Sequence, residues 1–152
     1  MAAQGPHVAV IGAGDAGPAE LAWAEEVGAG LAAAGAVVVT GGLGGVMEAA
    51  CRGARSRRGL TIGILPGLDR SEANGWVEVP VATGLGELRN GLIVRTTDAV
   101  VAIGGGAGTL SEIGFALKLG RRVVGLGTWD VAGVEPVAEP ADAVALVLAP
   151  PR

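Results

Sequence analysis

Short runs of apolar residues alternate with longer helix-like segments along almost the whole of this chain. The apolar runs are hydrophobic at successive positions, as in HVAVIG (7–12), AVVVT (36–40) and DAVVAI (98–103), and polar residues do not interrupt them in alternation. A strand of this composition is buried on both faces, which occurs mainly in parallel sheets covered by helices on both sides. The pattern therefore predicts an α/β fold with a doubly wound, mostly parallel sheet.

The 152 residues suit one domain, and no linker or change of composition divides them. The segment 128–140 has the weakest pattern and is expected to be the loosest part of the chain. Ligands of doubly wound sheets bind beyond the carboxyl ends of the strands, where the strand order reverses. Strands are expected at 7–12, 36–40, 60–66, 77–83, 98–103 and 122–127, and helices at 18–34, 45–57, 85–95, 109–119 and 140–148.

Composition excludes several classes of function. The net charge of −4 disfavours a general nucleic-acid-binding role, because phosphate backbones require clustered Lys and Arg. With Cys51 and His7 as the only residues of their kinds, no internal disulfide forms and no metal site is expected. No apolar run approaches the roughly 18 residues that a membrane span needs, and the first residues lack a signal-peptide pattern. We therefore expect a cytoplasmic protein without a membrane partner.

The first glycine loop, VIGAGDAG (10–17), contains G-x-G-x-x-G as Gly12, Gly14 and Gly17, between a predicted strand and a predicted helix. This is the fingerprint of dinucleotide-binding domains. Those domains also carry an acidic residue at the end of the second strand, yet no Asp or Glu occurs between residues 27 and 47. A dinucleotide, another nucleotide or phosphate, and a simple tight turn all remain open interpretations.

Two further glycine loops join a strand to a helix. TGGLGG (40–45) is weak evidence alone, but AIGGGAGT (102–109) places bare backbone N–H groups at a helix N-terminus, where a phosphate is favoured. No G-K-[ST] follows, so the third loop is not a Walker motif. The residues expected to bind the ligand here are Gly41, Gly42 and Gly44, together with Gly104, Gly105, Gly106, Gly108 and the hydroxyl of Thr109.

Glu112 and Arg89 admit two interpretations each. Thr109-Leu-Ser-Glu112 fits a capping box, in which the glutamate folds back onto the first turn of the helix. Arg89 lies on a predicted helix and is equally compatible with an ordinary surface residue. Local pattern alone does not separate these structural roles from functional ones.

The stretch ELRNGLIVRTTDAVVAIGGGAGTLSEIGFALKLGRRVVGL (87–126) resembles the LONELY GUY and lysine decarboxylase-like superfamily. The signature of that superfamily is an Arg-Lys pair, then a strand entered by Ser-Asp-Ala, then P-G-G-x-G-T-x-x-E. Two departures from it matter, because Asn90 stands in place of the lysine and Gly104 in place of the proline. The stretch is most similar to the subgroup of molybdenum-cofactor carrier proteins. The residues that carry the resemblance are Arg89, Asp98, Ala99, Gly105, Gly108, Thr109 and Glu112.

The resemblance implies a Rossmann-like homodimer or larger assembly that binds a phosphorylated nucleotide or pterin. The favoured hypothesis is a binding or carrier protein, whose cofactor is an AMP-like nucleotide or molybdenum cofactor. The alternative is a phosphoribohydrolase that cleaves the N-glycosidic bond of nucleoside 5′-monophosphates such as those of cytokinins. In that enzyme Glu112 stabilises the developing positive charge on ribose or orients the attacking water, and Arg89 positions the substrate.

A third hypothesis, an NAD(P)-dependent oxidoreductase, depends only on Gly12, Gly14 and Gly17. Lysine decarboxylation is not expected, because nothing marks a lysine placed for a pyridoxal Schiff base. The only lysine, Lys118, is expected to face outward near a helix end.

Overall fold

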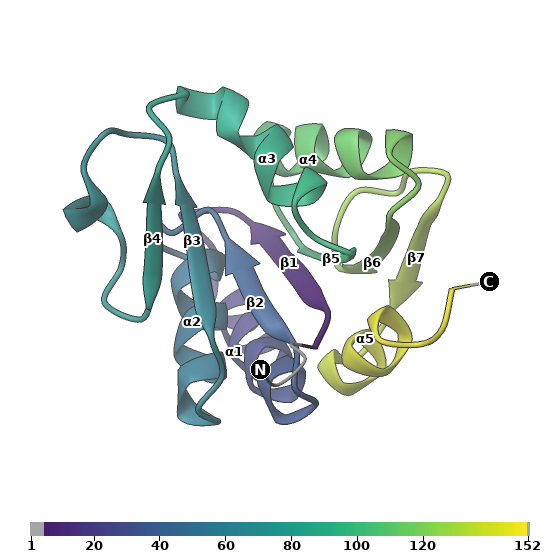
Figure 1. The fold of residues 1–152 in the computed structure, drawn as a ribbon. Helices are drawn as coiled ribbons and strands as arrows, with labels where there is room; N and C mark the ends of the chain where they lie inside the picture. The colour runs from purple at the N-terminus through teal and green to yellow at the C-terminus, as the bar shows by residue number, and fades with distance from the viewer. Residues whose placement is uncertain (1–4, 152) are drawn as a thin grey trace.

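Within residues 5–151, which the computed structural model describes, seven strands form one sheet in which all neighbours are parallel (Figure 1). Their order is β4-β3-β2-β1-β5-β6-β7. This sheet confirms the predicted Rossmann-like α/β fold. The strands are β1 (His7–Gly12), β2 (Val37–Thr40), β3 (Thr61–Leu65), β4 (Val79–Ala82), β5 (Ala99–Ile103), β6 (Arg122–Leu126) and β7 (Val134–Val137).

Helices cover both faces of the sheet (Figure 1). Successive side chains of a strand point to opposite faces, so Val8 and Val10 of β1 pack on one side and Ala9 and Ile11 on the other. The first face carries α1, α2 and α5, and the second carries α3 and α4. The bounds are α1 (Pro18–Ala33), α2 (Val46–Ser56), α3 (Arg89–Arg95), α4 (Ala107–Lys118) and α5 (Pro140–Val147), with short 3₁₀ turns η1 (Arg70–Glu72) and η2 (Gly86–Leu88).

The segment 128–140, expected to be the loosest part of the chain, contains the edge strand β7, which pairs with β6. The sequence pattern does not reveal this strand, because it is short and contains Pro136, which counts against a strand. A proline is tolerated on an edge strand, where the missing N–H need not face a partner. Residues 1–4 and 152 of the predicted domain 1–152 lie outside the described residues.

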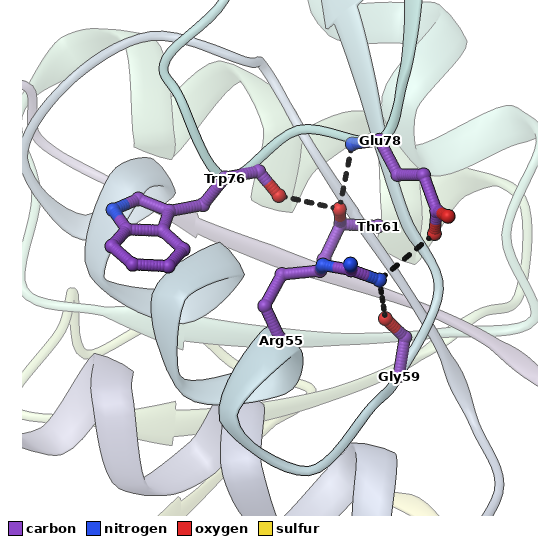
Figure 2. Close-up of polar contacts among 5 residues, drawn as sticks. All are labelled: Arg55, Gly59, Thr61, Trp76 and Glu78. Carbon is purple, nitrogen blue, oxygen red and sulfur yellow. Dashed lines mark hydrogen bonds and ion pairs between the residues drawn. The ribbon is translucent and has the colours of Figure 1, made fainter.

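The carboxyl end of α2 is tied to the start of β3 by polar contacts (Figure 2). Arg55 donates to the carbonyl oxygen of Gly59 at 3.3 Å and to the carboxylate of Glu78 at 3.1 Å. The hydroxyl of Thr61 donates to the carbonyl oxygen of Trp76 at 2.6 Å and accepts from the backbone N–H of Glu78 at 2.9 Å. These contacts place Trp76 at the amino end of β3, on the β4 side of the sheet.

Helices α1 and α2 pack closely because glycines lie where they meet. A methyl group on Gly28 of α1 would lie 2.0 Å from the carbonyl oxygen of Ala50, and one on Gly53 of α2 would lie 2.0 Å from that of Glu25. Real side-chain carbons do not approach backbone oxygens so closely, so these positions require glycine. No described helix of the chain is long and apolar enough to cross a membrane.

Replacing Gly28 by alanine is expected to lower the free energy of unfolding by about 2 kcal/mol or more, because the two helices must move apart. Gly114 of α4 is the matched control, since a methyl group there meets nothing within 4 Å. Gly114→Ala should raise stability by about 0.5–1 kcal/mol through lower chain entropy in the unfolded state. Urea denaturation measures both, and an unchanged midpoint for Gly28→Ala would contradict the packing argument.

Candidate functional site

The chain leaves β1 and β5 toward opposite faces of the sheet. After β1 it enters α1 on one face, and after β5 it enters α4 on the other. Because β1 and β5 are neighbours, their diverging loops open a crevice at the carboxyl edge, the usual ligand position of this architecture. A cavity of about 300 Å³ lies there, between the loops after β1 and β2, helix α3 and the start of α4.

The cavity gathers part of the predicted site. Seven residues that the site prediction did not include also line it, and these are Val10, Ile11, Ala13, Asp15, Met47, Asn90 and Ile93. The other predicted glycines, Gly17, Gly42, Gly44, Gly104 and Gly105, are not part of its lining. The predicted residues that line it are Gly12, Gly14, Gly41, Arg89, Gly106, Gly108, Thr109 and Glu112.

The backbone N–H groups of residues 105–109 donate no hydrogen bond within the described part of the chain. The N–H of Gly104 is bound to the carbonyl oxygen of Leu126 at 3.0 Å, and the first helical bond of α4 runs from Leu110 to Gly106. Helix N-termini leave such groups unsatisfied and carry a partial positive charge. Gly106, Gly108 and Thr109 therefore present free donors beside the cavity.

The glycines of the site fall into two kinds. A methyl group on Gly12 would lie 2.7 Å from the carbonyl oxygen of Ile103, and one on Gly41 would lie 2.7 Å from Nη2 of Arg89, so both positions are fixed by packing. By contrast, a methyl group on Gly14 or Gly106 would meet nothing within 4 Å. Packing within the chain does not require glycine at these two positions, which leaves bare backbone facing the cavity.

Gly104 and Gly105 do not line the cavity, but they allow the backbone conformation of the third glycine loop. Their φ angles are +52° and +98°, in the region that favours glycine. A methyl group on Gly104 would lie 2.7–2.9 Å from the carboxylate of Glu20, and one on Gly105 would overlap Thr109. Proline, whose ring holds φ near −65°, does not fit the conformation of Gly104. The backbone conformation at this position is therefore incompatible with the proline of the superfamily motif.

Arg89 is buried beneath the second glycine loop and bonds mainly to the protein. Its Nε donates to the carbonyl oxygen of Ile64 at 2.8 Å, its Nη2 to that of Gly41 at 3.4 Å, and its Nη1 to Oδ1 of Asn90. Three of its N–H groups are therefore engaged, and its burial lowers the pKa of the guanidinium. Arg89 holds the ends of β2 and β3 in place around the cavity.

Asn90 supplies a donor that the sequence did not reveal. Because its Oδ1 accepts from Arg89, its Nδ2 is left without an acceptor among residues 5–151. That nitrogen lies 3.8 Å from the position of a methyl group on Gly108. The sequence marked Asn90 only as a departure from a lysine. Its position in the second residue of a short helix gave no sign that it faces the third glycine loop.

Glu112 is only 7% exposed and forms no hydrogen bond or ion pair within residues 5–151. Burial raises the pKa of its carboxyl to about 8, and the nearby charge of Arg89 opposes this shift only in part. The capping-box interpretation was wrong, because α4 begins two residues earlier than predicted and Gly106 is its N-cap. At neutral pH the carboxyl is thus mainly protonated and is itself a hydrogen-bond donor.

Comparisons with known proteins give consistent matches. The model of the SLOG cluster4 family matches residues 5–149. A protein of Archaeoglobus fulgidus is 44% identical over 120 residues, which is 79% of each chain. The molybdenum cofactor binding protein from the phototrophic bacterium Rippkaea orientalis is 36% identical with a TM-score of 0.90, over 96% of this chain and 97% of that one. The molybdenum cofactor carrier protein from Chlamydomonas reinhardtii is 37% identical with a TM-score of 0.86, over 93% and 95%.

Replacing Glu112 by glutamine is expected to remove a pH dependence of stability. The folded-state pKa of Glu112 lies above its ordinary value of 4.5, so wild-type protein should lose stability relative to the variant as the pH rises from about 4.5 to about 8. The loss should reach roughly 4 kcal/mol and then level off. Urea denaturation between pH 5 and pH 9 measures it, with the exposed Glu26→Gln as control. Parallel pH curves for wild type and Glu112→Gln would show that the carboxyl is not desolvated.

Proposed function

The chain belongs to the SLOG cluster4 family, and on that premise we propose that it binds and carries a phosphate-bearing small molecule, either molybdenum cofactor or a nucleotide. The family match and the two molybdenum-cofactor proteins agree with the resemblance found in the sequence. Those two relatives align over more than nine-tenths of the chain. The cavity at the carboxyl edge of β1 and β5 is the proposed binding site.

The observation that carries this proposal is the convergence of unpaired donors on one cavity. They are the free backbone N–H groups of 106–109, the hydroxyl of Thr109, Nδ2 of Asn90 and the protonated carboxyl of Glu112. A phosphate offers several oxygen acceptors, and the N-terminus of α4 favours its negative charge. Because the buried carboxyl is mainly neutral at pH 7, it does not repel that charge.

A carrier needs a set of hydrogen-bond donors that holds the phosphate, called the phosphate cradle below, and it needs no reactive group. Among the described residues, the cavity lining includes no cysteine, histidine or lysine, and the carboxyl groups of Asp15 and Glu112 are its only side chains suited to proton transfer. In this proposal Arg89 positions the second glycine loop and adds positive potential, and Gly14 allows the ligand to approach the backbone of the first loop.

Gly108→Asp is expected to weaken binding of a nucleoside 5′-monophosphate at least about tenfold, because the introduced carboxylate occupies the free N–H groups and repels the phosphate. Aspartate is favourable in a first helical turn, so the variant should fold. Gly114→Asp is the matched control on the same helix, since Gly114 is exposed and lies outside the cavity lining. Isothermal titration calorimetry measures the affinities.

Mass spectrometry of ligands released from purified wild-type and variant protein identifies the natural cargo. We expect a phosphorylated pterin or nucleotide with the wild type and with Gly114→Asp, and its loss with Gly108→Asp. If the wild type releases no phosphorylated ligand and binds no nucleotide or pterin saturably, the carrier proposal is wrong.

The raised pKa of Glu112 favours a second candidate, the phosphoribohydrolase. A carboxyl whose pKa lies near the working pH is suited to proton transfer, here to the leaving base of a bound nucleoside monophosphate. In this alternative the phosphate cradle anchors the substrate and Glu112 acts on the glycosidic bond. The free donors serve both functions equally, so activity must separate them.

If the protein is this hydrolase, wild type should release free base from at least one nucleoside 5′-monophosphate, and Glu112→Gln should reduce that rate at least about 100-fold while phosphate binding persists. Chromatography of reactions with AMP, GMP and a cytokinin monophosphate checks it. If Glu112→Gln still releases base at the wild-type rate, Glu112 takes no part in the reaction. If the wild type releases no base from any of these substrates, the hydrolase proposal is wrong and the carrier proposal is retained.

Two expectations from the sequence remain predictions. The oxidoreductase hypothesis gains no support from the site, because the guanidinium of Arg89 lies at the end of β2, where dinucleotide-binding domains carry an acidic residue. A homodimer or larger assembly, which the resemblance implies, is part of our proposal and can be measured by analytical ultracentrifugation.

A further inference from the structure

The loop that follows β6 is bound to the third glycine loop. Nε1 of Trp129 donates to the carbonyl oxygen of Gly106 at 3.0 Å, and the hydroxyl of Thr128 donates to that of Gly104 at 2.6 Å. A second cavity of about 360 Å³ lies against this loop, lined by residues of 125–136 that include Trp129 and Asp130. Gly106 lines the proposed phosphate cavity and Trp129 lines the second one, so the hydrogen bond between these two residues links the two cavities.

The exposed indole of Trp129 is suited to stack on a flat heterocyclic ring of a ligand. It is 42% exposed although it is large and apolar, and the hydrogen bond of its indole to Gly106 holds it at the edge of the proposed phosphate site. Aromatic side chains stack on heterocycles, and each such contact contributes about tenfold or more to affinity. A ligand whose phosphate lies on the N-terminus of α4 would therefore have an aromatic surface within its reach.

Asp130 lies next to this surface and is exposed. It forms no hydrogen bond or ion pair with any other residue from 5 to 151. An ionised carboxylate offers two neighbouring acceptors and no donor. It therefore matches a heterocycle edge with two adjacent donors, such as the ring N–H and exocyclic amino group shared by guanine and pterins. Adenine presents one donor beside one acceptor, so it leaves this pairing incomplete.

We propose that Trp129 and Asp130 bind the heterocycle of the carried ligand and select 2-amino-4-oxo rings over adenine. Trp129 stacks on the ring, and Asp130 accepts from its ring N–H and its amino group. This inference rests on the proposed carrier function, because the phosphate cradle brings the ring to this loop. It assigns specificity to a segment outside the glycine motifs.

Binding of GMP, AMP and a phosphorylated hydroxymethylpterin to the full chain tests this proposal by calorimetry. Wild type should bind GMP and the pterin at least about tenfold more tightly than AMP. Asp130→Asn replaces one acceptor by a donor, so it should weaken GMP and the pterin about tenfold and should not weaken AMP, because an amide matches the donor and acceptor of adenine. Asp142→Asn, an exposed change on α5, is the control that should alter nothing. GMP and the pterin present the same ring N–H and amino group to Asp130. Whichever of the two binds more tightly identifies the preferred class of ligand.

Tryptophan fluorescence tests the stacking separately. Trp76 is the matched control, since it is also 42% exposed but lies at the amino end of β3 (Figure 2). Ligand should quench the fluorescence of wild type and Trp76→Phe, and the quenching should mostly disappear in Trp129→Phe. Because that variant keeps an aromatic ring, its affinity should fall less than about threefold, whereas Trp129→Ala should lose about tenfold or more. Equal losses in the two variants would assign the effect to the lost bond with Gly106 and overturn the stacking.

The two proposals fail in different ways. If GMP, AMP and the pterin bind equally, and Asp130→Asn leaves the ratio of their affinities unchanged while Gly108→Asp still weakens binding, the ring selection is wrong and the phosphate site stands. If none of the three ligands binds the wild type, the carrier function itself is wrong.

Discussion

The site depends on one constraint, which is that the chain leaves the neighbouring strands β1 and β5 toward opposite faces of the sheet. In a parallel sheet all carboxyl ends lie on one edge, and a crossover helix covers the gap between strands that it connects. No crossover connects β1 to β5, because one strand leads to α1 and the other to α4 on the opposite face. The gap at this edge stays open, and three glycine loops and helix α3 surround it.

Burial controls the charge of this gap. Arg89 and Glu112 are both buried, and desolvation lowers the pKa of Arg89 and raises the pKa of Glu112. Both shifts favour the neutral form of the side chain. The two do not form an ion pair among the described residues, and Arg89 instead bonds to carbonyl oxygens of the β2 and β3 segments. A guanidinium held by the backbone beside a protonated carboxyl makes the interior of the cavity rich in donors. That is the electrostatic character that an anionic ligand requires.

Glycine has distinct roles in this chain, and only the structure separates them. Gly28 and Gly53 allow helices α1 and α2 to approach, Gly12 and Gly41 allow strand ends to pack, and Gly104 has a φ of +52°. Gly106 has none of these reasons, since a methyl group there has open space. A glycine without a packing role at the edge of a cavity is better evidence for a ligand than the G-x-G-x-x-G spacing. That spacing includes Gly17, which does not line the cavity.

The sequence by itself determined six of the seven described strands, the five described α-helices to within a few residues, and where bare backbone follows a strand, because side-chain periodicity and glycine act within one element. It missed β7, which is short and contains a proline. It identified Glu112 and Arg89 through the motif, but not whether Glu112 caps its helix, since that depended on a boundary two residues away. Only the tertiary structure decided that Asn90 and Trp129 reach the third glycine loop, and that Glu112 is kept from water. These properties depend on atoms from α3, α4 and the loop after β6. Strand order brings those segments to one edge, and no local pattern encodes that order.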